Sequence, residues 1–273
     1  MKVLKLDKGG NMLAESIQEL ENISKEIRRN ILFQVYNASS GHVGGALSCA
    51  DILVAIYFNL IKEGDKVVLS KGHASAALYA TLAEKNFFPK EELSTFRKLN
   101  SRLQGHPSCL KTPGVDASSG SLGQGLSIAN GIALAFKMDN KDNYVYVILG
   151  DGEIDEGQIW EASMTASHYK INNLIAFLDY NKLQIDGTND EVMRISPVKE
   201  KFEAFGFFAQ EINGHNFSEI IEAVNKAKKQ DKPSIIIANT IKGKGVSFME
   251  NKCEWHGKAP KKEEYEEAIS ELK

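Results

Sequence analysis

Short runs of consecutive apolar residues alternate along this chain with longer stretches in which apolar residues recur every three or four positions. Continuous apolar runs are typical of strands that are buried on both faces of a parallel sheet. Three runs are especially clear: YVYVIL at 144–149, LIAFL at 174–178 and SIIIA at the start of 234–239. Weaker runs predict two further strands, at 66–69 and 207–212.

The longer stretches predict helices between these strands. Residues 15–36 place isoleucine and leucine at helical spacing, and similar patterns predict helices at 51–60, 75–85, 124–137, 158–169, 218–229 and from 262 onward. Alternation of strands and helices over this length predicts an α/β fold with a doubly wound, mainly parallel sheet flanked by helices. In such folds ligands bind at the carboxyl ends of the strands, so the loops that follow the strands are the first places to look for function.

Composition and charge exclude several classes of protein. The 273 residues include 33 Lys+Arg and 36 Asp+Glu, a net charge of −3, and 42% are hydrophobic. These values are ordinary for a soluble globular chain, and we expect no nucleic-acid partner because no basic face dominates. The most apolar window, 52–61, is too short to cross a membrane. The three cysteines form no CxxC pair, which predicts neither disulfides nor a zinc site and favours a reducing, cytoplasmic setting.

Two strand ends carry the residues that are expected to bind a metal. The run at 144–149 is followed by Gly-Asp-Gly-Glu, which contains Asp151, and Asn181 follows the next strand 30 residues later. Parallel neighbouring strands would bring both side chains to the same edge of the sheet. Either residue alone could be a simple turn residue, but together with a backbone carbonyl they predict a sparse Mg²⁺ site that a diphosphate completes.

Glycine-rich loops and histidines supply further candidates. Residues 120–125 read GSLGQG and precede a predicted helix, so their backbone amides could meet a ligand. Five of the six histidines adjoin a glycine, which leaves the imidazole little covered: His42, His73, His106, His215 and His256. We expect His215 to lie in a structural turn.

As a set, the segments SGHVGG, LSKGHA, GHP, SSGSLGQG, GDGEIDEGQIWEA, NKLQIDG and IKGKG…WHGKAP resemble the N-terminal, diphosphate-binding half of transketolase. The resemblance runs from about residue 39 to 260. It departs from the family at Val43 and Ser121, where proline is usual. It implies thiamine diphosphate and Mg²⁺ as cofactors, and a single diphosphate-binding domain over 1–273 with helical extensions at both ends.

The resemblance also assigns roles to individual residues. It implies that the metal is held by Asp151, Asn181 and Leu183, the last through its carbonyl. The residues implied to bind the cofactor are His73, Gly120, Ser121, Leu122, Gly152, Glu153, Asn181, Lys242 and His256. Those implied to act in catalysis are His42, His73, His106, His256 and Glu156. The histidines would bind sugar hydroxyls and move protons, and Glu156 would communicate with a second active site across a subunit interface.

We expect the pyrimidine-binding and C-terminal domains of transketolases to be absent from this chain, because the resemblance ends at about residue 260. We therefore expect a partner chain that carries both, in an α₂β₂ assembly that is active only when complete. The expected reaction is transfer of a two-carbon ketol unit from a ketose phosphate to an aldose phosphate. Two alternatives stay open: a subunit of another thiamine diphosphate enzyme, acting on 2-oxo acids or making deoxyxylulose phosphate, and a non-catalytic cofactor-binding remnant.

Overall fold

The computed structural model describes residues 16–273 and contains a five-stranded sheet in which all strands are parallel. The strand order is β1-β2-β3-β5-β4. The bounds are β1 Lys66–Leu69, β2 Val145–Gly150, β3 Leu174–Tyr180, β4 Phe208–Asn213 and β5 Ser234–Asn239. The predicted fold class is confirmed, and each predicted strand lies within two residues of an observed one.

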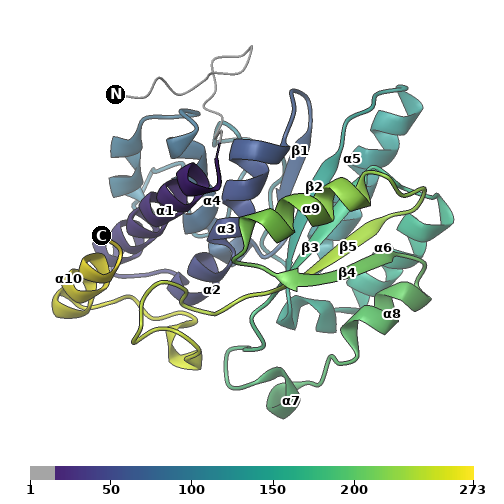
Figure 1. The fold of residues 1–273 in the computed structure, drawn as a ribbon. Helices are drawn as coiled ribbons and strands as arrows, with labels where there is room; N and C mark the ends of the chain where they lie inside the picture. Colours follow the sequence, from purple (N-terminus) through teal and green to yellow (C-terminus); the bar gives the residue numbers. More distant parts are fainter. Residues whose placement is uncertain (1–15) are drawn as a thin grey trace.

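Helices cover both faces of the sheet (Figure 1). One face carries α1 Ile17–Ala38, α2 Val43–Ser48, α3 Ala50–Ala55, α4 Ser75–Glu84, α9 Phe217–Ala227 and α10 Lys262–Glu271. The other carries α5 Gln124–Met138, α6 Gly157–His168 and α8 Val198–Ala204, and the short α7 spans Asn189–Val192. Alternate residues of β2 point to opposite cores, Tyr146 to the first and Val147 to the second, as the pleat of a strand requires.

Two predicted helices differ from the observed ones, and some short helices were not predicted. The helix expected at 51–60 is α3 followed by a π-helix over Ile56–Leu60. The short helices α2, α7 and α8 were not expected. The helix predicted at 15–36 begins at Ile17 within the described residues, and residue 15, with the rest of the expected N-terminal extension, lies outside them. Within residues 16–273 no helix has the length and apolar character needed to cross a bilayer, and all three cysteines are free thiols.

A buried charge cluster joins α1, α3 and the loop after β4. Arg28 of α1 donates to both carboxylate oxygens of Asp51, at 3.0 and 2.6 Å. His215 places Nδ1 2.6 Å from Asp51 and accepts the backbone N–H of Ile241 at 2.9 Å through Nε2. The structure thus confirms a structural position for His215, which supports the chain segment just before Lys242.

Replacing Asp51 by asparagine should destabilise the fold, because Arg28 would be left buried without a counter-charge. We expect Asp51→Asn to lower the free energy of unfolding by about 3–5 kcal/mol in urea titrations. Lys226→Ala, which breaks the exposed pair with Glu222, should change it little. Equal effects of the two substitutions would contradict this assignment.

The same cluster sets a pH dependence. Burial acts to raise the pKa of Asp51, but Arg28 and His215 outweigh it and hold the pKa well below its usual range. The stabilisation is therefore complete above the pKa of an unfolded aspartate, about 3.9, and is lost as the pH falls further. The difference in stability between wild type and Asp51→Asn should shrink in acid.

Candidate active site

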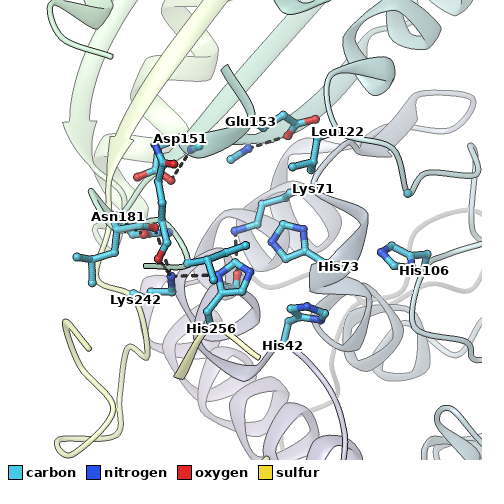
Figure 2. A pocket seen from close by; sticks show the side chains of 17 residues that line it. His42, Lys71, His73, His106, Leu122, Asp151, Glu153, Asn181, Lys242 and His256 are labelled. Atoms are coloured by element: carbon cyan, nitrogen blue, oxygen red, sulfur yellow. Dashed lines mark hydrogen bonds between the residues drawn. The ribbon is translucent and has the colours of Figure 1, made fainter. Parts of the chain in front are cut away.

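A cavity of about 320 Å³ opens at the carboxyl ends of the strands (Figure 2). Twelve predicted site residues line it: His42, His73, His106, Gly120, Leu122, Asp151, Gly152, Glu153, Asn181, Leu183, Lys242 and His256. They come from the loops after β1, β2, β3 and β5 together with the start of α2 and the loop that precedes α5. Loops from distant parts of the chain therefore converge on one cavity, as the parallel topology predicts.

Two predicted site residues lie outside this lining. Ser121 is exposed, between Gly120 and Leu122. Glu156 is the exposed N-cap residue of α6, and its side chain packs against the turn at Gly123. Gly123 has φ +82°, and a Cβ built there would lie 2.9 Å from Cβ of Glu156, so this turn requires glycine. Glu156 therefore packs on this turn and does not line the cavity that was expected to hold the cofactor.

The residues expected to bind a metal are close together. Gly150 of β2 pairs with Asp179 of β3, so Asp151 and Asn181 follow neighbouring strand ends. One carboxylate oxygen of Asp151 accepts the N–H of Lys182 at 2.6 Å, which fixes the Asn181 turn against it. Burial and the nearby Asp179 raise the pKa of Asp151 to about 6.

Residues 16–273 contain no group of three or more His, Cys, Asp or Glu that could hold a metal by itself. A carboxylate, an amide and the Leu183 carbonyl are hard oxygen donors, and they are too few to surround an ion. This donor set fits Mg²⁺ that receives its other ligands from phosphate and water.

Lys71 is a cavity residue that the sequence reasoning did not single out, although it stands in the segment LSKGHA. Its ammonium is buried, lies 2.5 Å from Asp179 and donates to the carbonyl of Gly45 at 3.0 Å. Burial acts to lower the pKa of Lys71, but Asp179 outweighs it and the pKa is raised. Ser48 at 2.5 Å and Thr240 also donate to Asp179, so one carboxylate joins β1, α2, β3 and the loop after β5.

Lys242 adds a second buried cation. Its ammonium donates to the carbonyls of Leu183 at 3.3 Å and Gln184 at 3.0 Å, and Nδ1 of His256 lies 3.1 Å away. Burial and the neighbouring Lys71 lower the pKa of Lys242 to about 8, so the side chain is mainly charged at pH 7. The cavity therefore carries two buried lysines. Lys71 is paired with Asp179, whereas Lys242 contacts carbonyls and His256 and is the cation that suits an anionic ligand.

Three imidazoles form a compact group beside these lysines, and Figure 2 places His106 further along the cavity. The ring centroids of His42, His73 and His256 are 5.3–5.4 Å apart. Burial lowers the pKa of all three, to about 4 for His42 and about 3 for His256, and Arg97 and Lys242 respectively add to the effect. The group is therefore neutral at pH 7 and can donate or accept hydrogen bonds without charge.

The loop before His256 is held by Trp255. This indole is fully buried and stacks edge-on against Phe248, with ring centroids 5.5 Å apart. The carbonyl of Trp255 lies against Gly44 of α2, where an added Cβ would approach it to 2.8 Å. Contact of this kind requires glycine at position 44 and keeps His256 beside His42.

Glu153 holds the loop at residues 120–123 through hydrogen bonds of its carboxylate. One carboxylate oxygen accepts the N–H of Gly123 at 2.9 Å and the hydroxyl of Ser70, and the other accepts the N–H of Gly150 at 2.9 Å. Burial raises the pKa of Glu153, and the hydrogen bonds from Ser70, Gly150 and Gly123 oppose that shift. The carboxylate is committed to the protein's own donors, so it positions the loop at 120–123.

Glu153→Gln should misplace that loop, because a glutamine amide has one acceptor oxygen in place of two. We expect a loss of about 1–3 kcal/mol in unfolding free energy. Asp155→Asn is the matched control, because this exposed carboxylate accepts a hydrogen bond from the Gln184 amide and from no other group of residues 16–273. Unchanged stability in Glu153→Gln, measured by urea titration, would refute this role.

Comparison with known proteins places the chain in a family. Residues 20–272 match the family model described as transketolase, thiamine diphosphate binding domain. The chain is 46% identical to the 6-deoxy-6-sulfo-D-fructose transketolase subunit SqwG of Clostridium sp. (strain MSTE9), over 95% of this chain and 98% of that protein. It is 41% identical to an apulose-4-phosphate transketolase subunit of Phocaeicola vulgatus, over 94% of each.

Longer transketolases match over part of their length. Homo sapiens transketolase is 38% identical over 94% of this chain, which spans 42% of that protein. The crystal structure of Campylobacter jejuni transketolase superimposes with a TM-score of 0.87 at 35% identity, covering 94% of this chain and 43% of that one. The chain thus belongs to the transketolase family of transferases, as its N-terminal, thiamine diphosphate-binding part.

Proposed function

We propose that this chain is the N-terminal subunit of a two-chain transketolase, which binds thiamine diphosphate with Mg²⁺ and transfers a two-carbon ketol unit from a ketose phosphate to an aldose phosphate. The observation that carries the proposal is the convergence of three kinds of group on one cavity: oxygen donors, buried lysines and neutral imidazoles. Each kind suits a different part of the expected ligands, namely the metal, the diphosphate and the sugar.

The metal and the diphosphate fit the inner end of the cavity. Asp151, Asn181 and the Leu183 carbonyl would ligate Mg²⁺, leaving the other positions to phosphate oxygens and water. Lys242 would neutralise the diphosphate together with Lys71, and His73 lies at the start of the turn that leads into α4, where free N–H groups favour an anion. The two lysines account for an anionic ligand better than for an uncharged one.

When bound, thiamine diphosphate supplies the electron sink for cleavage and formation of the carbon–carbon bond. The protein's own residues supply position and hydrogen bonds. His42, His106 and His256 would bind hydroxyl and carbonyl oxygens of the sugar. Because these imidazoles would be neutral, such hydrogen bonds add no charge to the cavity. Leu122 would cover the thiazolium ring, and Glu153 would hold the loop that carries Leu122 in place.

A second chain completes the proposed enzyme. Two relatives that match over almost their whole length are named as transketolase subunits, and this chain spans 42% of Homo sapiens transketolase. We propose a partner with the pyrimidine-binding and C-terminal domains in an α₂β₂ assembly. Glu156, exposed at the start of α6, would lie at the interface between active sites.

The names of the relatives do not identify the sugar substrate of this chain. One is named for 6-deoxy-6-sulfo-D-fructose and the other for apulose-4-phosphate, so an acidic terminal group is common to both names while the sugar differs. We propose a phosphorylated ketose as donor. Comparing its rate of ketol transfer with that of the sulfonated sugar discriminates between a phosphate-specific and a sulfonate-specific enzyme. The residues that bind the phosphate or sulfonate of the sugar would lie on the partner chain.

Cofactor binding is tested by titration calorimetry. The chain together with its partner should bind thiamine diphosphate only when Mg²⁺ is present, and Asp151→Ala should abolish binding because the carboxylate ligand is lost. Asp186→Ala changes an exposed carboxylate in the loop after β3 and should bind as wild type does. Absence of binding by the wild-type mixture would favour the non-catalytic alternative.

Activity is tested by reconstitution. The purified chain should be inactive with xylulose 5-phosphate and ribose 5-phosphate, and addition of the second chain should restore ketol transfer. The same mixture should be assayed with apulose 4-phosphate, with 6-deoxy-6-sulfofructose and with pyruvate. Ketol transfer by the single chain would overturn the two-chain proposal, and decarboxylation of pyruvate would favour a 2-oxo acid enzyme.

A further inference from the structure

Arg97 is held rigidly beside the cavity but does not line it. Its Nη1 donates to Oγ of Ser40 at 3.1 Å, and its guanidinium lies 5.5 Å from the centre of the Phe96 ring. Gly105 packs against the guanidinium so closely that an added Cβ would approach its Cζ to 2.8 Å. Among residues 16–273 no aspartate or glutamate forms an ion pair with Arg97, so no carboxylate neutralises its positive charge.

The remaining contact of Arg97 is with His42. Its Nη2 lies 3.3 Å from Nδ1 of His42. A guanidinium has only donors and keeps its protons in proteins, so Nδ1 must be the acceptor. A neutral imidazole carries one proton, which must then lie on Nε2. Burial and the charge of Arg97, followed by His106, Lys71 and Lys242, hold the pKa of His42 at about 4, so the neutral form is the one present at pH 7.

We propose that Arg97 is a positioning residue that fixes His42 as the tautomer protonated on Nε2, so that His42 donates a hydrogen bond to an oxygen of the sugar. The tautomer part stands on this chain alone, and the sugar part rests on the proposed function. Nε2 is the only ring nitrogen of His42 left for a ligand, and it is a donor. His42 is thereby assigned to binding an acceptor oxygen, and the proton shuttling expected of it from family resemblance is excluded while the bond from Arg97 holds.

The tautomer can be measured directly on the full chain labelled with ¹⁵N-histidine. Two-bond ¹H–¹⁵N correlation spectra distinguish protonated from unprotonated ring nitrogens, and a His42→Gln spectrum assigns the signal. We expect Nδ1 unprotonated and Nε2 protonated in the wild type. Arg97→Met should convert this signal to a mixture of tautomers, and Arg97→Lys, which keeps a donor, should restore it.

Arg102→Met is the matched control, because Arg102 follows Arg97 by five residues and pairs with Glu92. It should leave the His42 signal unchanged. If Arg97→Met does not fold, Ser40→Ala loosens the guanidinium without removing it and should broaden or shift the signal. A wild-type His42 protonated on Nδ1, or a signal that no substitution of Arg97 or Ser40 moves, would overturn the proposal.

Kinetics of the reconstituted enzyme test the consequence for the sugar. Arg97→Met should lower kcat/KM roughly tenfold, the equivalent of one hydrogen bond, and Arg97→Lys should recover most of it. An unchanged kcat/KM in Arg97→Met would overturn the sugar-binding part. Failure of the wild-type mixture to transfer a ketol unit would count against the proposed function, and the spectra would still decide the tautomer.

Discussion

The ion pair between Lys71 and Asp179 is the interaction on which the rest of the site depends. It crosses from the end of β1 to the end of β3, over β2, in a fully buried environment. A lone charge at either place would be very costly, and the hydrogen bonds from Ser48 and Thr240 satisfy the remaining lone pairs of the carboxylate. Because these partners come from four segments, the pair fixes the mutual position of the loops that form the cavity.

Electrostatics then follow from this arrangement. Burial, with Arg97 beside His42 and Lys242 beside His256, keeps these imidazoles neutral, and burial together with the nearby Asp179 raises the pKa of Asp151. Cations that donate to Nδ1 of His42 and His256 leave Nε2 of each ring for a ligand. The cavity thus has buried ammonium groups at one end, with Lys71 paired to Asp179, and neutral imidazoles at the other. This division suits a phosphorylated ligand beside a polyhydroxylated one.

The sheet was predictable because buried parallel strands are apolar throughout, and LIAFL and SIIIA are read directly from the sequence. The short helix α2 was not, since its six residues contain two glycines and are held by burial rather than by local preference. Asp151 and Asn181 were predictable from spacing. Lys71 and Arg97 were missed because their roles come from Asp179 and His42, which are distant in sequence. Only the folded chain shows such pairs.

The position of Trp255 has a practical consequence. The chain contains two tryptophans, and Trp160 lies on α6 among Phe202 and Phe205, on the other face of the sheet. Trp255 immediately precedes His256, and the ammonium of Lys258 lies 3.9 Å from the centre of its ring. Its fluorescence emission is therefore sensitive to movement of the loop that carries His256. In a Trp160→Phe background it becomes a single intrinsic optical reporter of that loop, which needs neither a dye nor a coupled enzyme.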